Sequence, residues 1–363
     1  MASIKLTKLG LFYEELIASA LYLAYPDIRC VGNECSLKSL DVLKERLNSK
    51  RGNRTVIDVL RSEFGIVGGS RTFSAGRCGK IVFGKVLDKA SDYLSEYLNY
   101  VNVEALARSL NTIRIRGGSI EHGTGPYIDC NVAPPIALVD FVEGMRVYPA
   151  EQFDEGKGFK RCVKMDCHVY AMVLAGFALT YVGRGGDEGT TRFLVLPAQP
   201  YDVLPDEHIK VVNALTGLDL SKLPEHVIYA LILSSISVPR GIYKLVAIKY
   251  EGNRKRASKK VAMLFELTVD VAQYRDFVMA AYATNARGAI LEIARGLERQ
   301  KRGVVQRGEE ERELNIGSEA LRKLIVASEN PQLKDRLIAE ALSELYRLKA
   351  DWANTLIELA SWL

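Results

Sequence analysis

The chain has 363 residues, of which 48% are hydrophobic and 26% are charged, and it carries a formal net charge of +5. This is the composition of an ordinary folded protein, and a chain of this length can bury a core that needs neither metal nor disulfide to hold it. The best candidate for an apolar segment, residues 9–25, contains Glu14 and Glu15 near its middle, which excludes a membrane span and a signal peptide. We therefore expect a cytoplasmic protein with no membrane partner.

The first third of the chain is expected to be helical. Apolar residues recur at helical spacing in four stretches, which are residues 9–25, 36–48, 54–64 and 86–110. A glycine-rich loop over residues 65–84 separates the last two of these helices.

The middle third carries the strand signals. Isoleucine and arginine alternate over residues 111–116, and a second glycine-rich loop, residues 117–125, leads to another strand over residues 127–132. Asp166 is expected to cap a helix that continues through Leu174. Two antiparallel hairpins are expected, with strands over residues 177–182 and 191–196 and over residues 243–250 and 261–269. Between the hairpins we expect two short helices, over residues 206–215 and 224–234.

From residue 271 to the last residue only helices are expected. They cover residues 271–302, 318–328 and 331–363, and a polar linker over residues 303–317 holds an acidic run. The predicted fold class is therefore α+β, with a helical N-terminal part, an irregular mixed α/β body with antiparallel hairpins, and a C-terminal helical bundle. We place a domain boundary near Val271, which divides the chain into residues 1–270 and residues 271–363.

The six cysteines leave three interpretations open. Cys30 and Cys35 have the same spacing as Cys162 and Cys167, and His168 follows the second pair. Buried free thiols are the plainest interpretation, because zinc sites usually have tighter spacing. A disulfide becomes the better interpretation if the source is a hyperthermophile. Six Gln and four His beside 49 Lys+Arg and 44 Asp+Glu are typical of such a source.

Catalytic motifs are weak. Residues 76–80 read GRCGK, but Ser74 stands where a P-loop needs its first glycine, and Ile81 replaces the hydroxyl that would hold magnesium. His122, in the second glycine-rich loop beside Glu121, is the best candidate for acid–base chemistry. We expect no catalytic residue, no cofactor and no metal. An enzyme built on the glycine-rich loops and His122 remains the least favoured alternative.

Basic clusters on loops and element ends are the strongest functional signal. Five cations that crowd one turn repel each other unless anions are near, and a projecting basic ribbon can follow the phosphates of a nucleic acid. The clusters lie in residues 44–54, 71–80, 157–164, 254–260 and 299–307. The predicted nucleic-acid-binding residues are Lys50, Arg51, Asn53, Arg54, Arg71, Arg77, Lys80, Arg254, Lys255, Arg256, Lys259, Lys260, Arg299 and Arg302.

Arg114 and Arg116 alternate with Ile113 and Ile115, so the two arginines share one face of a strand. An outer face that is ion-paired explains this pattern simply. A row of phosphate contacts is the alternative.

The order of these elements resembles the large subunit of an archaeal type I-A CRISPR interference complex (Cascade). The stretch MDCHVYAMVLAGFALTYVG, residues 165–183, and the helical bundle from Val271 resemble parts of these proteins. The resemblance implies a role in antiviral defence, in which a non-catalytic subunit recognises the protospacer-adjacent motif and stabilises the unwound target DNA. The implied partners are guide RNA, target DNA, the other Cascade subunits and a helicase–nuclease.

Under this hypothesis, the hairpin with Arg254 to Arg256 contacts duplex DNA, and Arg51 and Asn53 reach base edges from a tight turn. The runner-up is a stand-alone DNA- or RNA-binding protein, viral or regulatory.

Overall fold

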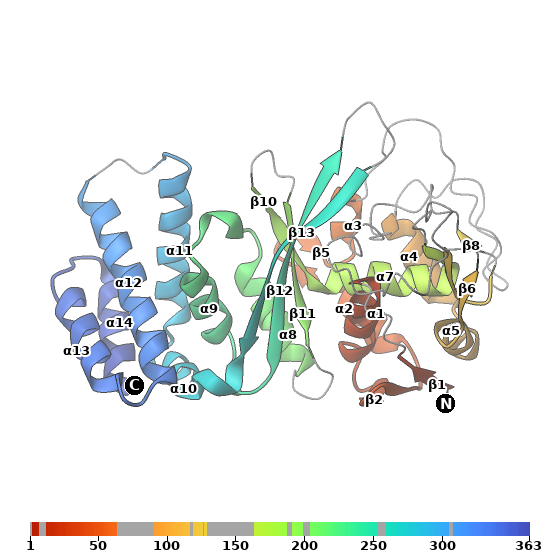
Figure 1. The fold of residues 1–363 in the computed structure, drawn as a ribbon, viewed down its shortest axis with the longest axis horizontal. Coiled ribbons are helices and arrows are strands. Elements are labelled where there is room, and N and C mark those ends of the chain that lie inside the picture. The colour runs from red at the N-terminus through yellow and green to blue at the C-terminus, as the bar shows by residue number, and fades with distance from the viewer. Residues whose placement is uncertain are drawn as a thin grey trace, which may run out of the picture. The chain divides into compact units, whose positions relative to one another are not determined.

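The computed structural model confirms the α+β class (Figure 1). It divides into two compact units, Met1–Tyr181 with Ile248–Leu264 and Val182–Ala247 with Phe265–Leu363. The residues that the structure describes are 2–6, 12–63, 90–116, 119–125, 127–128, 163–186, 191–198, 204–252, 259–304 and 308–363.

The first unit begins with a small antiparallel sheet that the sequence did not predict. Strands β1 (Ala2–Lys5), β3 (Glu34–Leu37) and β2 (Ile28–Val31) lie in the order β1-β3-β2. Each strand has only four residues. Four residues are too few for a period-two pattern to stand out from the helical patterns around them.

Cys30 and Cys35 face each other across β2 and β3 and form a disulfide with an S–S distance of 2.05 Å. The expectation of free thiols was therefore wrong for this pair. Cys167 is disulfide-bonded as well. No cluster of three or more potential metal ligands lies among the residues that the structure describes.

Helix α7 (Cys167–Thr180) forms the centre of the first unit. All fourteen of its residues are buried, and Asp166 caps its N-terminus as predicted. The helix continues to Thr180, so the strand expected from residue 177 begins only at Tyr181. Helix α1 (Phe12–Tyr22) packs against α7 at Gly176, where a Cβ atom would overlap the carbonyl group of Leu16.

Four further helices and a second sheet belong to the same unit. Asn102 caps a new helix, so the single helix expected over residues 86–110 is two helices. The sheet has the order β6-β7-β9-β8, with β7 and β9 parallel. The helices are α2 (Asp41–Asn48), α3 (Asp58–Glu63), α4 (Ala90–Tyr100) and α5 (Val103–Leu110), and the strands are β6 (Ile113–Arg116), β7 (Ser119–His122), β8 (Tyr127–Ile128) and β9 (Val163–Asp166).

A four-stranded sheet in the order β10-β11-β12-β13 contains both predicted hairpins. Its strands are β10 (Tyr181–Gly185), β11 (Thr191–Pro197), β12 (Ile242–Gly252) and β13 (Lys259–Asp270). Helices α8 (Pro205–Leu215) and α9 (Glu225–Leu233) confirm the two short helices expected between the hairpins. Short 3-10 helices cover Leu220–Lys222 (η4) and Val271–Tyr274 (η5).

The C-terminal helices are confirmed, but their boundaries differ from the predicted ones. The expected linker over residues 303–317 is largely the start of α12, whose first turn carries Glu309, Glu310 and Glu311. Carboxylates are stabilised there by the helix dipole, so the acidic run begins a helix instead of interrupting one. The helices are α10 (Arg275–Ala283), α11 (Arg287–Lys301), α12 (Glu309–Glu329), α13 (Lys334–Leu345) and α14 (Asp351–Trp362).

The structure does not divide the chain at the boundary expected near Val271. One hydrophobic core includes Phe193, Val227 and Leu245 together with Phe277, Leu321 and Leu356 of the C-terminal helices. The described helices after residue 271 therefore share one core with residues from Val182 onwards.

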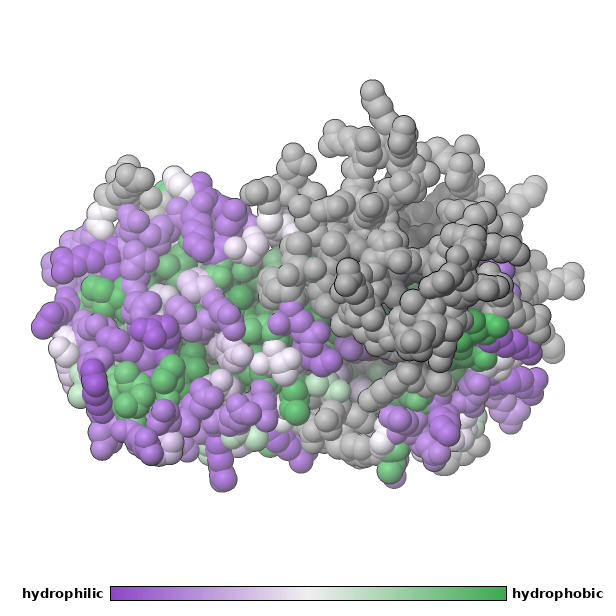
Figure 2. All heavy atoms as spheres, in the orientation of Figure 1, coloured by the Kyte–Doolittle hydropathy of each residue, from purple (hydrophilic) through white to green (hydrophobic). Residues whose placement is uncertain are grey.

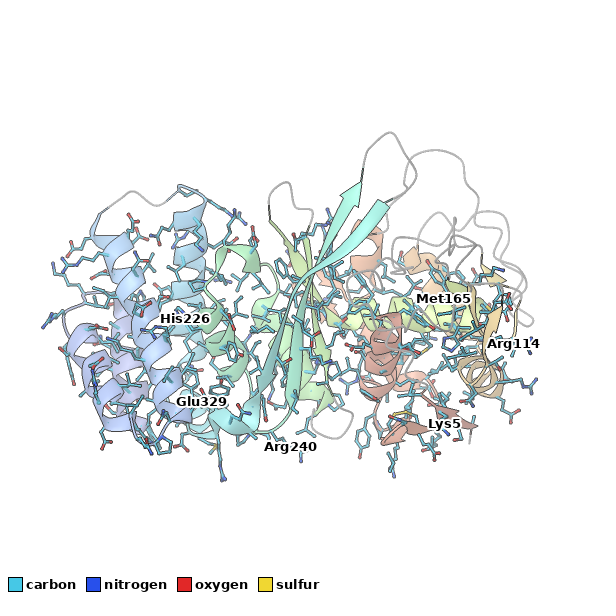
Figure 3. All side chains as sticks on the ribbon, viewed as in Figure 1. Lys5, Arg114, Met165, His226, Arg240 and Glu329 are labelled. Atoms are coloured by element: carbon cyan, nitrogen blue, oxygen red, sulfur yellow. A yellow bond between two sulfur atoms is a disulfide. The ribbon has the colours of Figure 1, made fainter. Side chains whose placement is uncertain are left out.

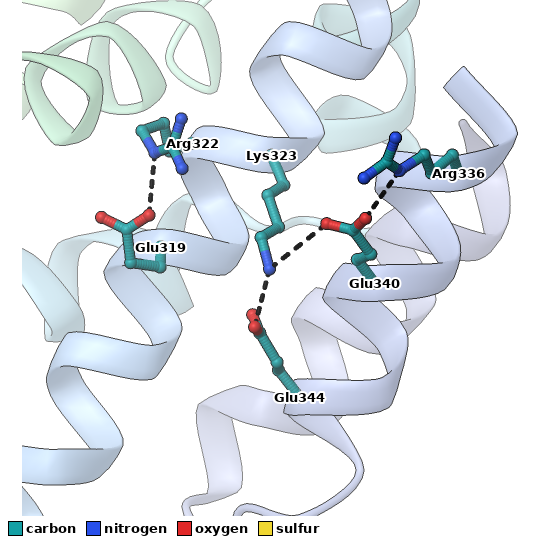
Figure 4. A network of polar contacts seen from close by, with 6 residues as sticks. All are labelled: Glu319, Arg322, Lys323, Arg336, Glu340 and Glu344. Atoms are coloured by element: carbon teal, nitrogen blue, oxygen red, sulfur yellow. Dashed lines mark hydrogen bonds and ion pairs between the residues drawn. The ribbon is translucent and has the colours of Figure 1, made fainter. Parts of the chain in front are cut away.

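An ion-pair network joins α12 to α13 (Figure 4). Lys323 is only 14% exposed, and its Nζ lies 2.6 Å from Glu344 and 3.8 Å from Glu340, which also accepts a hydrogen bond from Arg336. On the face drawn in Figure 2, hydrophilic side chains cover much of the C-terminal helices, with small apolar areas between them. None of the described helices has both the length and the apolar character needed to pass through a bilayer.

We predict that Gly176→Ala lowers the free energy of unfolding by about 1–3 kcal/mol, because the added methyl group meets backbone that cannot rotate away. Urea denaturation measures the effect. Gly288→Ala, in α11, is the matched control, because a Cβ atom there meets nothing within 4 Å. Equal stability of the two variants would contradict the close approach of α1 to α7.

Candidate nucleic-acid interface

The basic cluster of residues 44–54 forms a tight turn in the first unit. Strands β4 (Lys50–Arg51) and β5 (Arg54–Thr55) pair antiparallel, with Lys50 opposite Thr55 and Arg51 opposite Arg54. Gly52 has φ 61°, at the position where a type II′ turn places its glycine. Lys50, Asn53 and Arg54 are exposed.

Arg51, which pairs with Arg54 in the register, is instead anchored to the end of α7. Its Nη1 donates to the carbonyl of Tyr181 at 2.6 Å, and its Nη2 donates to the carbonyl of Leu179 at 3.2 Å. Burial lowers the pKa of Arg51 to about 10, which still leaves it charged at neutral pH. The guanidinium therefore stabilises the C-terminus of a helix, and base-edge contact from this turn is left to Asn53.

Lys50 and Arg54 have no carboxylate within ion-pair distance among the described residues. Lys44, on the preceding helix, donates to the neutral side-chain oxygen of Asn99 at 2.5 Å and so keeps its charge unpaired as well. Cations that no acid neutralises among the described residues, on the same turn as the exposed amide of Asn53, match the requirement of a phosphate-contacting surface.

The cluster around Arg299 and Arg302 has a different explanation. Arg302 is ion-paired with Glu298, and Arg299 lies 4.0 Å from Glu310 at the start of α12. Cations at the end of α11 and acids at the start of α12 each complement their own helix dipole. Both arginines therefore have an acidic neighbour, unlike Lys50 and Arg54 among the described residues.

The hairpin β12–β13 is longer than predicted, so Lys259 and Lys260 belong to a strand and not to the connection. The predicted contacts that lie outside the described residues are Arg71, Arg77, Lys80, Arg254, Lys255 and Arg256.

Arg114 of β6 belongs to a sheet whose neighbouring strands carry charges of both signs. Glu121 of β7 lies opposite Arg114, and Lys164 of β9 lies next to Glu121 with Nζ 3.4 Å from its carboxylate. Opposite charges thus alternate across three strands. This arrangement favours the ion-paired outer face over a row of phosphate contacts.

His122 is buried and has structural contacts at both ring nitrogens. Its Nε2 lies 3.1 Å from the carbonyl of Leu110, which can only accept, so Nε2 carries the proton and Nδ1 accepts from the hydroxyl of Tyr13. The residues that follow are held by Asp166, which accepts from the amide of Thr124 at 2.8 Å and from Ser109. These contacts give His122 a structural role in holding the loop that follows β7. They do not support the acid–base chemistry for which His122 was the best candidate in the sequence.

No family model matches this sequence, and no curated protein or solved structure is detectably similar to it.

We predict that Arg51→Met lowers the free energy of unfolding by about 1–3 kcal/mol, because the carbonyls at the end of α7 lose their donor. Arg54→Met, on the same turn but exposed, is the matched control and is expected to stay within about 0.5 kcal/mol of the wild type. Chemical denaturation distinguishes them. If Arg54→Met were the more damaging change, the anchoring role of Arg51 would be refuted.

We also predict that stability falls in mild acid. Burial lowers the pKa of His122 and of His168, whose Nδ1 lies 2.8 Å from the hydroxyl of Tyr97. The folded protein then binds fewer protons than the unfolded chain. Unfolding free energy should therefore decrease as pH falls below about 6.5, by up to about 1.4 kcal/mol per pH unit for each histidine.

Urea titrations between pH 7.5 and 5.0 test this, because carboxylates contribute mainly below that window. A flat profile over these pH values would show that the two imidazoles are not held neutral.

Proposed function

We propose that this chain is a non-catalytic nucleic-acid-binding subunit of a CRISPR interference complex, which recognises the protospacer-adjacent motif and stabilises unwound target DNA. The observation that carries the proposal is the β4–β5 turn, where Arg51 fixes the turn to α7 and Lys50, Asn53 and Arg54 are exposed with no acidic partner in the part of the chain that the structure describes. Resemblance in element order supports the assignment to this kind of complex.

The distribution of charge agrees with this role. Residues 1–307 contain 42 basic and 33 acidic residues, whereas residues 308–363 contain 7 basic and 11 acidic residues. The excess of positive charge thus lies in the part of the chain that holds the turn, both glycine-rich loops and the basic hairpin. Such an excess attracts a polyanion and accelerates its encounter.

A small contact surface is sufficient for the proposed task. In guide-directed recognition, base pairing with the guide RNA supplies most of the sequence specificity, and the protein reads only a short motif. Asn53, with two donors and an acceptor on its amide, can contact a base edge, and Lys50 and Arg54 can bind the flanking phosphates. Guide RNA, target DNA, the other Cascade subunits and a helicase–nuclease are the proposed partners.

We predict that the double variant Lys50→Glu/Arg54→Glu weakens binding to motif-containing DNA by about 10- to 100-fold at moderate salt. The slope of log affinity against log salt concentration should fall by about 2, one unit for each phosphate that the variant no longer neutralises. Arg240→Glu/Arg347→Glu makes the same change in net charge at two exposed sites of the second unit and should have little effect.

Fluorescence anisotropy on the isolated chain and on the guide-loaded complex gives both quantities. Equal affinity of the two double variants would remove the turn from the interface. Tight binding by the isolated chain that gains nothing from the guide-loaded complex would instead favour a stand-alone DNA- or RNA-binding protein.

A further inference from the structure

An exposed tyrosine belongs to the same group of packed elements as the basic turn of the first unit. Tyr100 is the last residue of α4 and is 68% exposed. Its neighbour Asn99 accepts a hydrogen bond from Nζ of Lys44 at 2.5 Å, which joins the end of α4 to the first turn of α2. Helix α2 leads directly into β4, and β5 leads into α3, which packs against α4. The chain thus returns to α4 on both sides of the β4–β5 turn.

The ring of Tyr100 is open to solvent. Among the tyrosines described in the first unit, Tyr25 and Tyr100 are the exposed ones. Tyr25 already has a cation from its own chain over its ring, because the guanidinium of Arg29 lies 6.0 Å from the ring centroid. Tyr100 has no ring or cation contact among the described residues. A planar group from outside the chain can therefore lie against Tyr100.

The charges near Tyr100 suit a polyanion. Lys44 donates to a neutral amide, and the last turn of α4, which reads YLNY, contains no acid. Helix α2 has eight residues and is about 12 Å long, so Lys44 near its start and Lys50 just after its end can contact different phosphates of one strand. Unpaired cations spread along a helix, with an exposed aromatic ring beside them, have the chemistry of a surface that binds single-stranded nucleic acid.

An exposed aromatic ring distinguishes a single strand from a duplex. The bases of a duplex stack on one another, so their faces are closed to a side chain outside the double helix. An unpaired base has a free π-face, and its stacking on an aromatic side chain depends little on its sequence. A tyrosine beside phosphate-binding cations therefore adds affinity only for a strand whose bases are unpaired.

We propose that Tyr100 stacks on an unpaired base and that Tyr100 and Lys44 bind the single DNA strand released when the target is unwound. The inference rests on the proposed function, because it takes the β4–β5 turn as the place where the duplex is contacted. In this arrangement the released strand passes from the turn along α2 to Tyr100. Asn53 reads the motif, and Tyr100 holds the strand without reading its sequence.

Fluorescence anisotropy of the full-length protein with a labelled oligothymidine of about 12 nucleotides, within the usual range of site sizes, tests the stacking role. Tyr100→Ala should weaken binding by about 5- to 100-fold, the loss expected for one stacked base. Tyr100→Phe keeps the ring and should bind within about twofold of the wild type. Tyr346→Ala is the matched control, because it removes a tyrosine that is 69% exposed in the second unit.

The salt dependence separates stacking from charge. Tyr100→Ala should leave the slope of log affinity against log salt concentration unchanged, because it removes no phosphate contact. Lys44→Gln should lower the magnitude of that slope by about 0.7, the value for one phosphate of a single strand. Lys5→Gln is the charge control and should leave the slope unchanged, because it removes an exposed cation from β1 of the same unit (Figure 3).

Thermal unfolding checks that each variant is folded. Equal affinity of Tyr100→Ala and the wild type for oligothymidine would overturn the proposal. So would a loss in Tyr100→Phe as large as in Tyr100→Ala, or an equal loss with a blunt duplex, because the ring would then not be stacking on an unpaired base. A larger effect of Tyr100→Ala on oligouridine than on oligothymidine would overturn the assignment to DNA in favour of RNA.

Binding of motif-containing duplex DNA provides the separating measurement. Tyr100→Ala should leave the affinity of the isolated chain for this duplex unchanged within about twofold, because paired bases cannot stack on the ring. If the wild type binds the duplex but not oligothymidine, the stacking site is refuted and the proposed function stands. If single-strand binding depends on Tyr100 but the guide-loaded complex adds nothing to duplex binding, the stacking site stands and the proposed function is refuted.

Discussion

A fully buried helix can exist only if the groups at its two ends are satisfied, and α7 meets this constraint with two charged side chains. At its N-terminus Asp166 accepts hydrogen bonds from the amides of His168 and Val169, both at 3.0 Å. At its C-terminus Arg51 donates to the carbonyls of Leu179 and Tyr181. An acid and a base thus stand where the helix dipole favours each of them. Neither charge could be buried at such a position without these partners.

The two end groups also connect the core to the surface. The second carboxylate oxygen of Asp166 accepts hydrogen bonds from the amide of Thr124 and the hydroxyl of Ser109. The loop after β7 is therefore held in place by the residue that caps α7. Arg51 belongs to the β4–β5 turn, so Lys50, Asn53 and Arg54 are displayed by a segment that the core fixes in place. A polar surface that is fixed before binding loses less conformational entropy when it meets a ligand. The packing of one helix therefore prepares the surface that we propose for nucleic acid.

The sequence predicted those elements whose local signals agree with their tertiary surroundings. Asp166 as a cap, α8, α9 and the paired strands β12 and β13 follow from capping residues and from long patterns of one period. The sheet of β1, β2 and β3 was missed because four-residue strands carry almost no period. The start of α12 was missed because its acids resemble a polar linker until the helix dipole is taken into account.

The candidate site shows the same limit more sharply, because a cluster of cations in the sequence does not reveal which of them are neutralised. Arg299 and Arg302 look equivalent to Lys50 and Arg54 in sequence, yet the first two lie within ion-pair distance of Glu310 and Glu298, and the second two have no such acid among the described residues. Alternation along β4 implies that Lys50 and Arg51 point to opposite sides, but it does not say which side is solvent. A cation that binds a ligand differs from a structural one in whether an acid lies nearby, and that acid can come from a distant part of the chain.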